Sequence, residues 1–217
     1  GLFVAEGERL CAEIPPEDMV EVYMSSDYRR SHPAERCDYV LKNGEFERLA
    51  DTKHPQGILA IARQRRYALS DILGGSLYII LDTIQDPGNL GTIIRTAEAA
   101  GVAAVIMNKG CAEIYSPKVV RSTMGSIFRV PFLCTDDPGD VIARMKQSGV
   151  RIYAADMSGK NLSEIKFTDK RAFIIGNEAN GITEDVLKLA DEKVSIPMAG
   201  KVKSLNAAVS SAILMYH

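Results

Sequence analysis

Short runs of apolar residues alternate with helix-like stretches through the last two-thirds of the chain. Each run is almost entirely apolar, which is typical of strands in a parallel sheet that helices cover on both faces. The predicted strands are residues 78–81, 103–107, 152–155, 172–175 and 194–196. The predicted helices are residues 91–100, 117–125, 141–148, 184–190 and 205–216. This alternation predicts an α/β fold with a parallel sheet.

The first 66 residues have shorter apolar runs and predict a smaller α/β unit. Strands are expected at residues 2–5 and 19–24, and a helix at residues 8–13. Further short elements are expected at residues 39–41, 46–49 and 58–61. Residues 67–76 contain Ser and Gly and predict a linker. We therefore expect one domain at residues 1–66 and a second at residues 77–217.

The composition of the 217 residues is that of an ordinary globular protein, with 46% hydrophobic and 25% charged residues. No apolar run approaches the roughly 18 residues that a membrane span requires. The four cysteines are widely scattered, which argues against a zinc site or a disulfide scaffold and favours a cytoplasmic protein without a metal. The N-terminus lacks a secretory signal and a Met, so we expect further residues upstream. The net charge of −2 gives no support for a nucleic-acid partner.

The first loop with unusual chemistry follows the strand at 78–81 and contains Asp-Pro-Gly-Asn at residues 86–89. Pro and Gly in this order are typical of a tight turn. Asn89 and Arg95 are six residues apart across the start of the next helix, so both could face one ligand. The alternative is structural: Asn89 caps the helix, and Arg95 pairs with Glu98 three residues on.

A second loop, Gly-Asn-Glu-Ala-Asn-Gly at residues 176–181, follows the strand at 172–175. Glycines at both ends allow the backbone to approach a ligand closely, and Glu178 places a charge at the end of a buried strand. The loop is neither a dinucleotide fingerprint nor a phosphate-binding P-loop. An ordinary strand-to-helix turn remains the alternative, and the hydroxyl of Thr183 is expected to cap the following helix.

A third loop, residues 196–206, passes through Pro and Gly and presents Ser204 and Asn206 at the start of the last helix. The structural alternative makes Ser204 the helix cap and Asn206 a neighbour that competes for the same donors. Ligands of open α/β sheets bind beyond the carboxyl ends of the strands, where all three loops are expected. Together the loops predict a pocket.

In these three loops the chain resembles the SpoU/TrmH family of RNA ribose methyltransferases, within the SPOUT superfamily. The family's three motifs match residues 86–101, 174–182 and 196–212 in order, and residues 116–131 also look like the family. The resemblance implies a C-terminal trefoil knot, a homodimer and S-adenosylmethionine as cofactor. Lys203 departs from the pattern, because an acidic residue often stands there.

The resemblance implies that a ribose 2′-hydroxyl attacks the methyl group of S-adenosylmethionine. The implied catalytic residues are Arg95, Asn89, Glu178, Ser204 and Asn206. The implied cofactor-binding residues are Gly176, Asn177, Ile196, Met198 and Leu205. An arginine base is unusual because its pKa lies above about 12, so Arg95 could instead stabilise the developing charge.

Residues 1–66 resemble the substrate-binding domain, similar to a small ribosomal RNA-binding protein, that many family members carry. Residues 3–8 and 50–60 carry this likeness, and several basic side chains could contact phosphates. These are Arg29, Arg30, His32, Arg36, Arg63, Arg65 and Arg66, and the alternative for them is a solvated basic face.

The expected substrate is large-subunit (23S-type) ribosomal RNA, with transfer RNA second. A non-catalytic RNA-binding protein that retains the fold is the chief alternative, although mere binding would not require the whole set of motif residues. A nucleotide-dependent oxidoreductase is disfavoured, because the chain lacks the glycine fingerprint after its first strands.

Overall fold

A six-stranded parallel sheet is the centre of the computed structural model, which describes residues 1–202 and 204–217. Its strand order is β10-β8-β9-β5-β6-β7. The strands are β5 (Leu77–Asp82), β6 (Ala104–Asn108), β7 (Phe132–Thr135), β8 (Arg151–Asn161), β9 (Arg171–Gly176) and β10 (Glu192–Ser195). The α/β fold with a parallel sheet is therefore confirmed. The sequence pattern misses β7, an edge strand of four residues whose apolar run, residues 132–134, is short and buries only Phe132.

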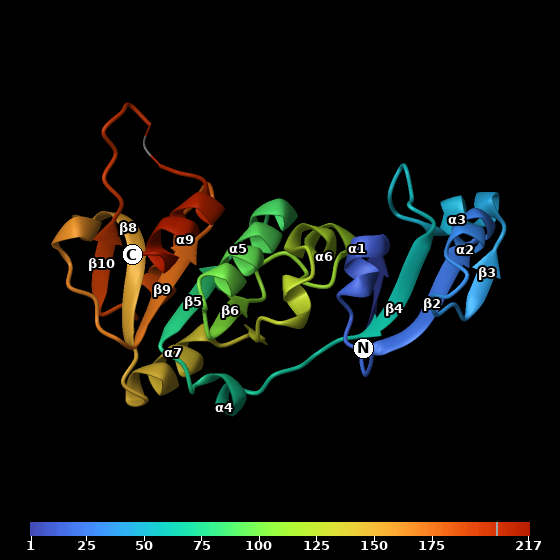
Figure 1. Ribbon diagram of the computed structural model, residues 1–217. Helices are drawn as coiled ribbons and strands as arrows, with labels where there is room; N and C mark the ends of the chain where they lie inside the picture. The colour runs from blue at the N-terminus through green and yellow to red at the C-terminus, as the bar shows by residue number, and fades with distance from the viewer. Residues whose placement is uncertain (203) are drawn as a thin grey trace.

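Helices cover both faces of this sheet (Figure 1). One face carries α5 (Pro87–Ala99), α6 (Pro117–Thr123) and α9 (Ala207–Met215), and the other carries α4 (Leu69–Ile72), α7 (Pro138–Gln147) and α8 (Glu184–Leu187). Alternate residues of β5 serve the two faces: Ile79 packs on the α5 side and Ile80 on the α7 side. Because helices cover both faces, all six residues of β5 are buried, as the unbroken apolar run at its centre predicts. Two short 3-10 turns are η1 (Ser126–Phe128) and η2 (Leu162–Glu164).

A second sheet of four strands, in the order β1-β4-β2-β3, lies within the first 63 residues. It consists of β1 (Leu2–Glu6), β2 (Met19–Ser25), β3 (Tyr39–Leu41) and β4 (Ile58–Arg63), with α1 (Glu8–Ala12), α2 (Ser26–Ser31) and α3 (Asn43–Leu49). Residues 46–49 form the end of a helix, and α2 is an element that the apolar pattern does not predict. The segment expected as a linker contains α4, whose Leu69 and Ile72 are buried against the larger sheet.

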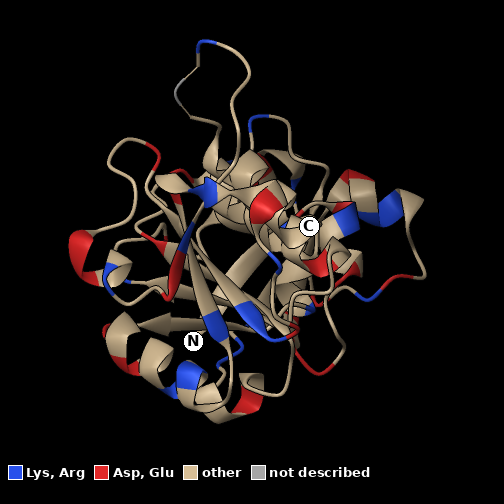
Figure 2. Cartoon of the chain, turned by 90° about the vertical axis from the view of Figure 1, so that its left-hand side faces the viewer, with Lys and Arg blue, Asp and Glu red and all other residues tan. Residues whose placement is uncertain are grey.

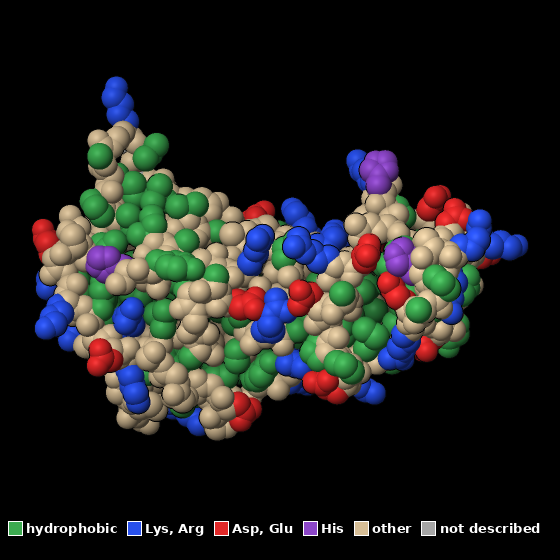
Figure 3. Space-filling model, viewed as in Figure 1, with side chains coloured by type: hydrophobic (Ala, Val, Ile, Leu, Met, Phe, Trp, Pro, Cys, Tyr) green, Lys and Arg blue, Asp and Glu red, His purple; other side chains and the backbone are tan. Residues whose placement is uncertain are grey.

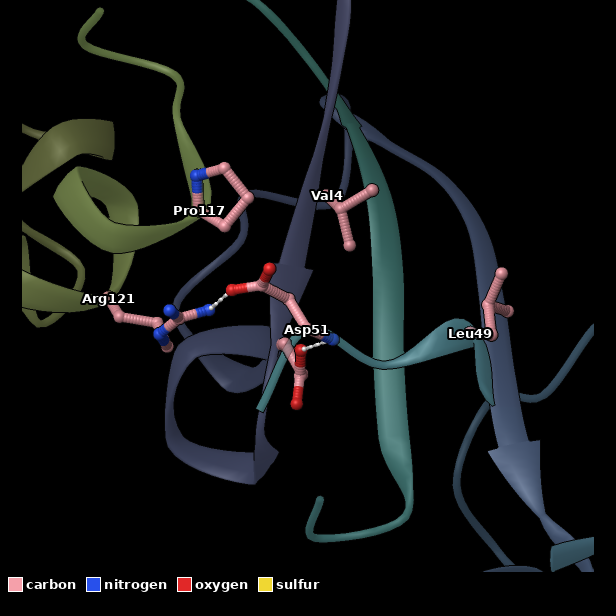
Figure 4. A pocket seen from close by; sticks show the side chains of 6 residues that line it. Val4, Leu49, Asp51, Pro117 and Arg121 are labelled. Carbon is pink, nitrogen blue, oxygen red and sulfur yellow. Dashed lines mark hydrogen bonds and ion pairs between the residues drawn. The ribbon is translucent and has the colours of Figure 1, made fainter. Parts of the chain in front are cut away.

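The two sheets are joined by a packed junction. Phe3 of β1 contacts the rings of Tyr115 and Phe128, with centroid separations of 4.7 and 5.9 Å. The Tyr115 hydroxyl donates to the Arg65 carbonyl at 2.9 Å. Figure 4 shows a second contact at the same junction, where Arg121 of α6 reaches Asp51 at 2.8 Å. The first unit is therefore held against the larger sheet by apolar, hydrogen-bonded and ionic contacts.

Candidate active site

The three loops with unusual chemistry meet at the start of α5. The Asn89 side-chain amide donates to Glu178 Oε1 at 2.7 Å. Its carbonyl oxygen accepts a hydrogen bond from the Asn206 amide at 2.9 Å. Three residues from three separate loops are thus connected through one side chain. The loops thus bring together three of the predicted catalytic residues, Asn89, Glu178 and Asn206. Ser204, two residues before Asn206, is exposed and makes no hydrogen bond among the described residues.

The caps of the flanking helices differ from those expected. Asp86 caps α5 by accepting a hydrogen bond from the Asn89 backbone N–H at 2.7 Å, so the alternative in which Asn89 is the cap is wrong. Asn206, not Ser204, caps α9, because its side-chain oxygen accepts from the N–H groups of Ala208 and Val209. Asn206 therefore fixes the start of α9 with its oxygen and holds Asn89 with its nitrogen.

Arg95 lies on α5 away from this cluster. A step of six helical residues advances about 9 Å along the axis and turns about 600°, so Arg95 and Asn89 point to different sides. Arg95 is exposed and lines a separate hollow with residues of α1 and of the segment after α6. The expected pair between Arg95 and Glu98 is absent from the described residues, because Arg129 binds Glu98. Among the described residues of one chain, Arg95, like Ser204, makes no hydrogen bond to the other predicted catalytic residues.

A buried carboxylate that the sequence reasoning passes over organises the same edge of the sheet. Asp82 ends β5 and is only 1% exposed. It accepts hydrogen bonds from the Asn108 amide at 2.5 Å and from the Thr183 backbone N–H at 2.6 Å. The hydroxyl of Thr183 makes no capping bond, contrary to expectation. A single Asp that closes an otherwise apolar strand is the signal that could have found this residue.

The loop at 176–181 is held by its own side chains. Asn177 donates to the Thr83 carbonyl at 2.8 Å and accepts from the N–H groups of Ala179 and Asn180 at 3.0 Å each. A Cβ atom at Gly176 would overlap the backbone of the chain returning at Gly181, so only glycine fits there. Its backbone N–H and C=O also exchange hydrogen bonds with Gly181 at 2.9 and 3.0 Å, so Asn177 is committed to the shape of the loop.

The remaining candidates for cofactor binding flank the exit from β10. Ile196, Met198 and Leu205 are each half-buried. Among the described residues, 197–202 take part in no backbone–backbone hydrogen bond of a turn or loop. Unused backbone donors and acceptors beside half-buried apolar side chains suit the adenosyl part of S-adenosylmethionine, which combines a flat ring with polar edges. Lys203 lies outside the described residues.

The basic side chains expected to contact RNA in the first unit are largely engaged with the protein itself. Arg30 pairs with Asp27, Arg36 with Asp38, and Arg65 with Asp18. At the opposite end of the molecule, that of β8 and β10, which faces the viewer in Figure 2, basic and acidic side chains are likewise interspersed. Among the described residues, 1–202 and 204–217, no ion pair involves Arg63 or Arg66, so these two are the better candidates of the set.

Two further properties of the described residues concern membrane-spanning helices and metal sites. No helix in the part of the chain that the structure describes is long and apolar enough to cross a membrane. Across residues 1–202 and 204–217, no group of three or more His, Cys, Asp or Glu side chains is arranged to hold a metal ion.

Comparison with known proteins gives the same family as the motifs of the three loops. The model described as the SpoU rRNA Methylase family matches residues 76–216. The chain is 34% identical to the 23S rRNA (guanosine(2553)-2′-O)-methyltransferase RlmP of Bacillus subtilis (strain 168), over 99% of this chain and 87% of that protein. It is also 34% identical to the 23S rRNA (guanosine-2′-O-)-methyltransferase RlmB of Bordetella pertussis, over 87% of this chain and 77% of that protein. The solved SpoU methyltransferase AviRb from Streptomyces viridochromogenes, in complex with AdoMet, aligns with a TM-score of 0.87 at 27% identity, covering 100% of this chain and 88% of that chain.

Proposed function

The chain belongs to the SpoU rRNA methylase family, and we propose that it transfers a methyl group from S-adenosylmethionine to a ribose 2′-hydroxyl of 23S-type ribosomal RNA. The observation that carries this proposal is the connection of Asn89, Glu178 and Asn206, one from each family motif. Two relatives named as 23S rRNA methyltransferases support ribosomal RNA over transfer RNA.

The cofactor site is proposed between the loop at 176–181 and the segment after β10. When bound, S-adenosylmethionine supplies an electrophilic methyl group on its sulfonium. The backbone at Gly176 and the side chains of Ile196, Met198 and Leu205 would hold its adenosyl part, and Asn177 would fix the shape of the loop around it. The unused backbone groups of residues 197–202 support this assignment. The AdoMet complex of the structurally similar AviRb supports the choice of cofactor.

The 2′-hydroxyl is a weak nucleophile and must lose its proton as the new bond forms. Asn89, Glu178, Ser204 and Asn206 are proposed to position the ribose. Arg95 is proposed to bind the RNA backbone and so to hold the RNA in place, without contact to the reacting oxygen. A guanidinium remains protonated at neutral pH, which favours that role over proton abstraction.

A homodimer is proposed, supported by apolar side chains that α9 leaves in water. Val209 is 47% exposed and Tyr216, just after the helix, is 67% exposed. Nearly every residue of this helix is apolar or small, so the side that faces away from α5 needs another partner. A second copy of the same helix would bury both side chains.

We also propose the family's trefoil knot and an RNA-binding role for residues 1–66. After edge strand β10 the chain returns inward to pack α9 against α5 and β9, and a knotted chain end must follow such a course. The packed junction with the first unit would hold RNA at a fixed distance from the loops.

Methyl transfer from labelled S-adenosylmethionine tests the function. Unmodified 23S rRNA and transfer RNA transcripts are incubated with wild type, with Arg95→Ala, and with the matched exposed control Arg48→Ala. We expect label at a 2′-hydroxyl of 23S rRNA, seen as a linkage that resists alkaline hydrolysis, with wild type and Arg48→Ala but not with Arg95→Ala. Cofactor binding without transfer to either RNA would refute the proposal and favour a non-catalytic RNA-binding protein.

A further inference from the structure

A hollow of about 410 Å³ lies where α1 of the first unit meets α5 and the segment after α6. We call it the arginine hollow. It is lined by Arg9, Glu13, Arg95, Glu98, Ala99, Met124, Ser126 and Arg129. Three arginines and two glutamates give it a net charge of +1. Figure 3 shows Lys and Arg side chains gathered on this part of the surface, over α5 and α6.

Arg129 neutralises both carboxylates of the hollow. It donates to Glu13, at the end of α1, and to Glu98 on α5, with a second bond to Glu98 of 3.2 Å. Hydrogen bonding from Arg129 holds the pKa of the Glu98 carboxyl below its usual range. Both glutamates are thus engaged by a single guanidinium.

The capture of these two glutamates has a consequence for the other arginines. Glu13 is four residues after Arg9, and Glu98 is three residues after Arg95, so each is the local partner that helical spacing would supply. Within residues 1–202 and 204–217, Arg9 and Arg95 take part in no ion pair and no hydrogen bond to a carboxylate. Two exposed guanidinium groups from two different units are therefore available on one hollow.

We propose that the arginine hollow binds a phosphate of the RNA backbone, with Arg9 and Arg95 as its ligands and Arg129 as a positioning residue. This inference rests on the proposed function, because it takes RNA as the substrate. Planar guanidinium groups match the oxygens of a phosphodiester in shape and charge. A polar, open hollow with free cations suits a phosphate that remains partly hydrated.

The position of the hollow adds to the argument. Arg95 is about 9 Å along α5 from Asn89, since each helical residue advances about 1.5 Å. A phosphate bound in the hollow would therefore lie within a few nucleotides of a ribose held at Asn89. Because Arg9 belongs to the first unit, the same phosphate would connect both units of the protein to one RNA strand.

Binding of an unmodified 23S rRNA transcript at several salt concentrations tests Arg9. The full chain, Arg9→Ala and the control Arg48→Ala, which removes an exposed arginine of the same unit, are compared by filter binding. We expect Arg9→Ala to bind about fivefold more weakly and to lower the slope of log K against log salt by about 0.7 to 0.9, the effect of one lost phosphate contact. Arg48→Ala should stay within about twofold of wild type. Equal behaviour of the two variants, or no binding by wild type, would overturn the proposal.

A second set of variants tests the role of Arg129. In Arg129→Met the two glutamates are released and can pair with Arg9 and Arg95, so RNA binding should fall about tenfold. Adding Glu13→Gln and Glu98→Gln to Arg129→Met removes those competing charges and should restore binding to within about threefold. A merely structural arginine would not be rescued by the two glutamines, and that outcome would remove Arg129 from the proposal.

Methyl transfer measured on the same samples separates this inference from the proposed function. If wild type methylates the transcript while Arg9→Ala binds and reacts as Arg48→Ala does, the hollow is refuted and the enzyme stands. If wild type methylates no RNA but Arg9→Ala still weakens binding and lowers the salt slope, the hollow is supported and the enzymatic proposal fails. In a working enzyme, Arg9→Ala should raise KM for RNA by a larger factor than it changes kcat.

Discussion

Replacing Asp82 by Asn would change a single atom in the most buried polar group beneath the candidate site. Both carboxylate oxygens accept hydrogen bonds, one from the Asn108 amide and one from the Thr183 backbone N–H. An asparagine can accept only one of them, and its NH₂ group must face the other donor. Because the position is 1% exposed, water cannot replace the lost acceptor.

The expected loss follows from these contacts. A buried donor left without a partner costs about 1–3 kcal/mol, and the bond to a charged acceptor contributes toward the upper end. We therefore expect Asp82→Asn to lower the free energy of unfolding by about 2–3 kcal/mol. For a chain of this size each kcal/mol corresponds to roughly 2–4 °C, so the melting temperature should fall by about 4–12 °C.

The substitution should also weaken cofactor binding. Thr183 follows the loop at 176–181, so its backbone bond to Asp82 sets where that loop turns. Calorimetric titration at a temperature where the variant is fully folded should show S-adenosylmethionine binding weakened by about tenfold or more, the factor for ~1.4 kcal/mol. The control is Asp169→Asn, an exposed aspartate with no ion pair among the described residues, which should match wild type. Melting within 1 °C of wild type, together with unchanged cofactor affinity, would refute the role of Asp82.

Three further predictions concern other contacts. Asn89→Ala removes both bonds that connect the loops and should lower methyl transfer about a hundredfold, while circular dichroism shows melting within about 2 °C of wild type. Tyr115→Phe removes the hydroxyl bond to the Arg65 carbonyl and should lower the free energy of unfolding in urea by about 1 kcal/mol; no loss would mean that water replaces this bond. Glu98→Gln should cost about 0.5 kcal/mol at pH 7, a small value because the pair with Arg129 is partly exposed. The folded pKa of Glu98 is lowered by Arg129, so this stabilisation is present above the unfolded pKa of about 4.3 and is lost as the pH falls through the folded pKa; an equal cost in urea unfolding at pH 7 and pH 3 would contradict it.

The strands of the larger sheet were predictable because burial on both faces leaves an unbroken apolar run, as in β5. The edge strand β7 was missed because its apolar run, residues 132–134, is too short to separate a strand from a loop by pattern alone. The cap of α5 was also within reach. Pro87 favours the first helical position, which assigns the cap to Asp86 and leaves the Asn89 side chain free for the other loops.

The sequence alone did not predict that Arg95 would be left without its helical partner Glu98. Helical spacing offers Glu98 as a partner, and such a pair contributes about 0.2–0.5 kcal/mol. Arg129, which is 31 residues after Glu98 in the chain, competes with Arg95 for the Glu98 carboxylate. It makes more hydrogen bonds than a helical pair would, two of them to Glu98. It is placed there by the turn after α6 and by the junction with α1, both products of tertiary packing. Local rules therefore identify Arg95 as a candidate but not the hollow that it faces.

Helix α5 connects the two parts of the proposed RNA site. It presents Asn89 to the loops at its start and Arg95 to the arginine hollow about one and two-thirds turns later. Its Leu90, Ile93 and Ile94 are fully buried, and it packs between α6 and α9. A helix held in this way cannot bend appreciably between the two residues, so the distance from phosphate to ribose is set before RNA arrives. Such preorganisation lowers the entropy that binding must otherwise cost, and it gives a reason for the first unit to be packed against the larger sheet rather than tethered by a flexible linker.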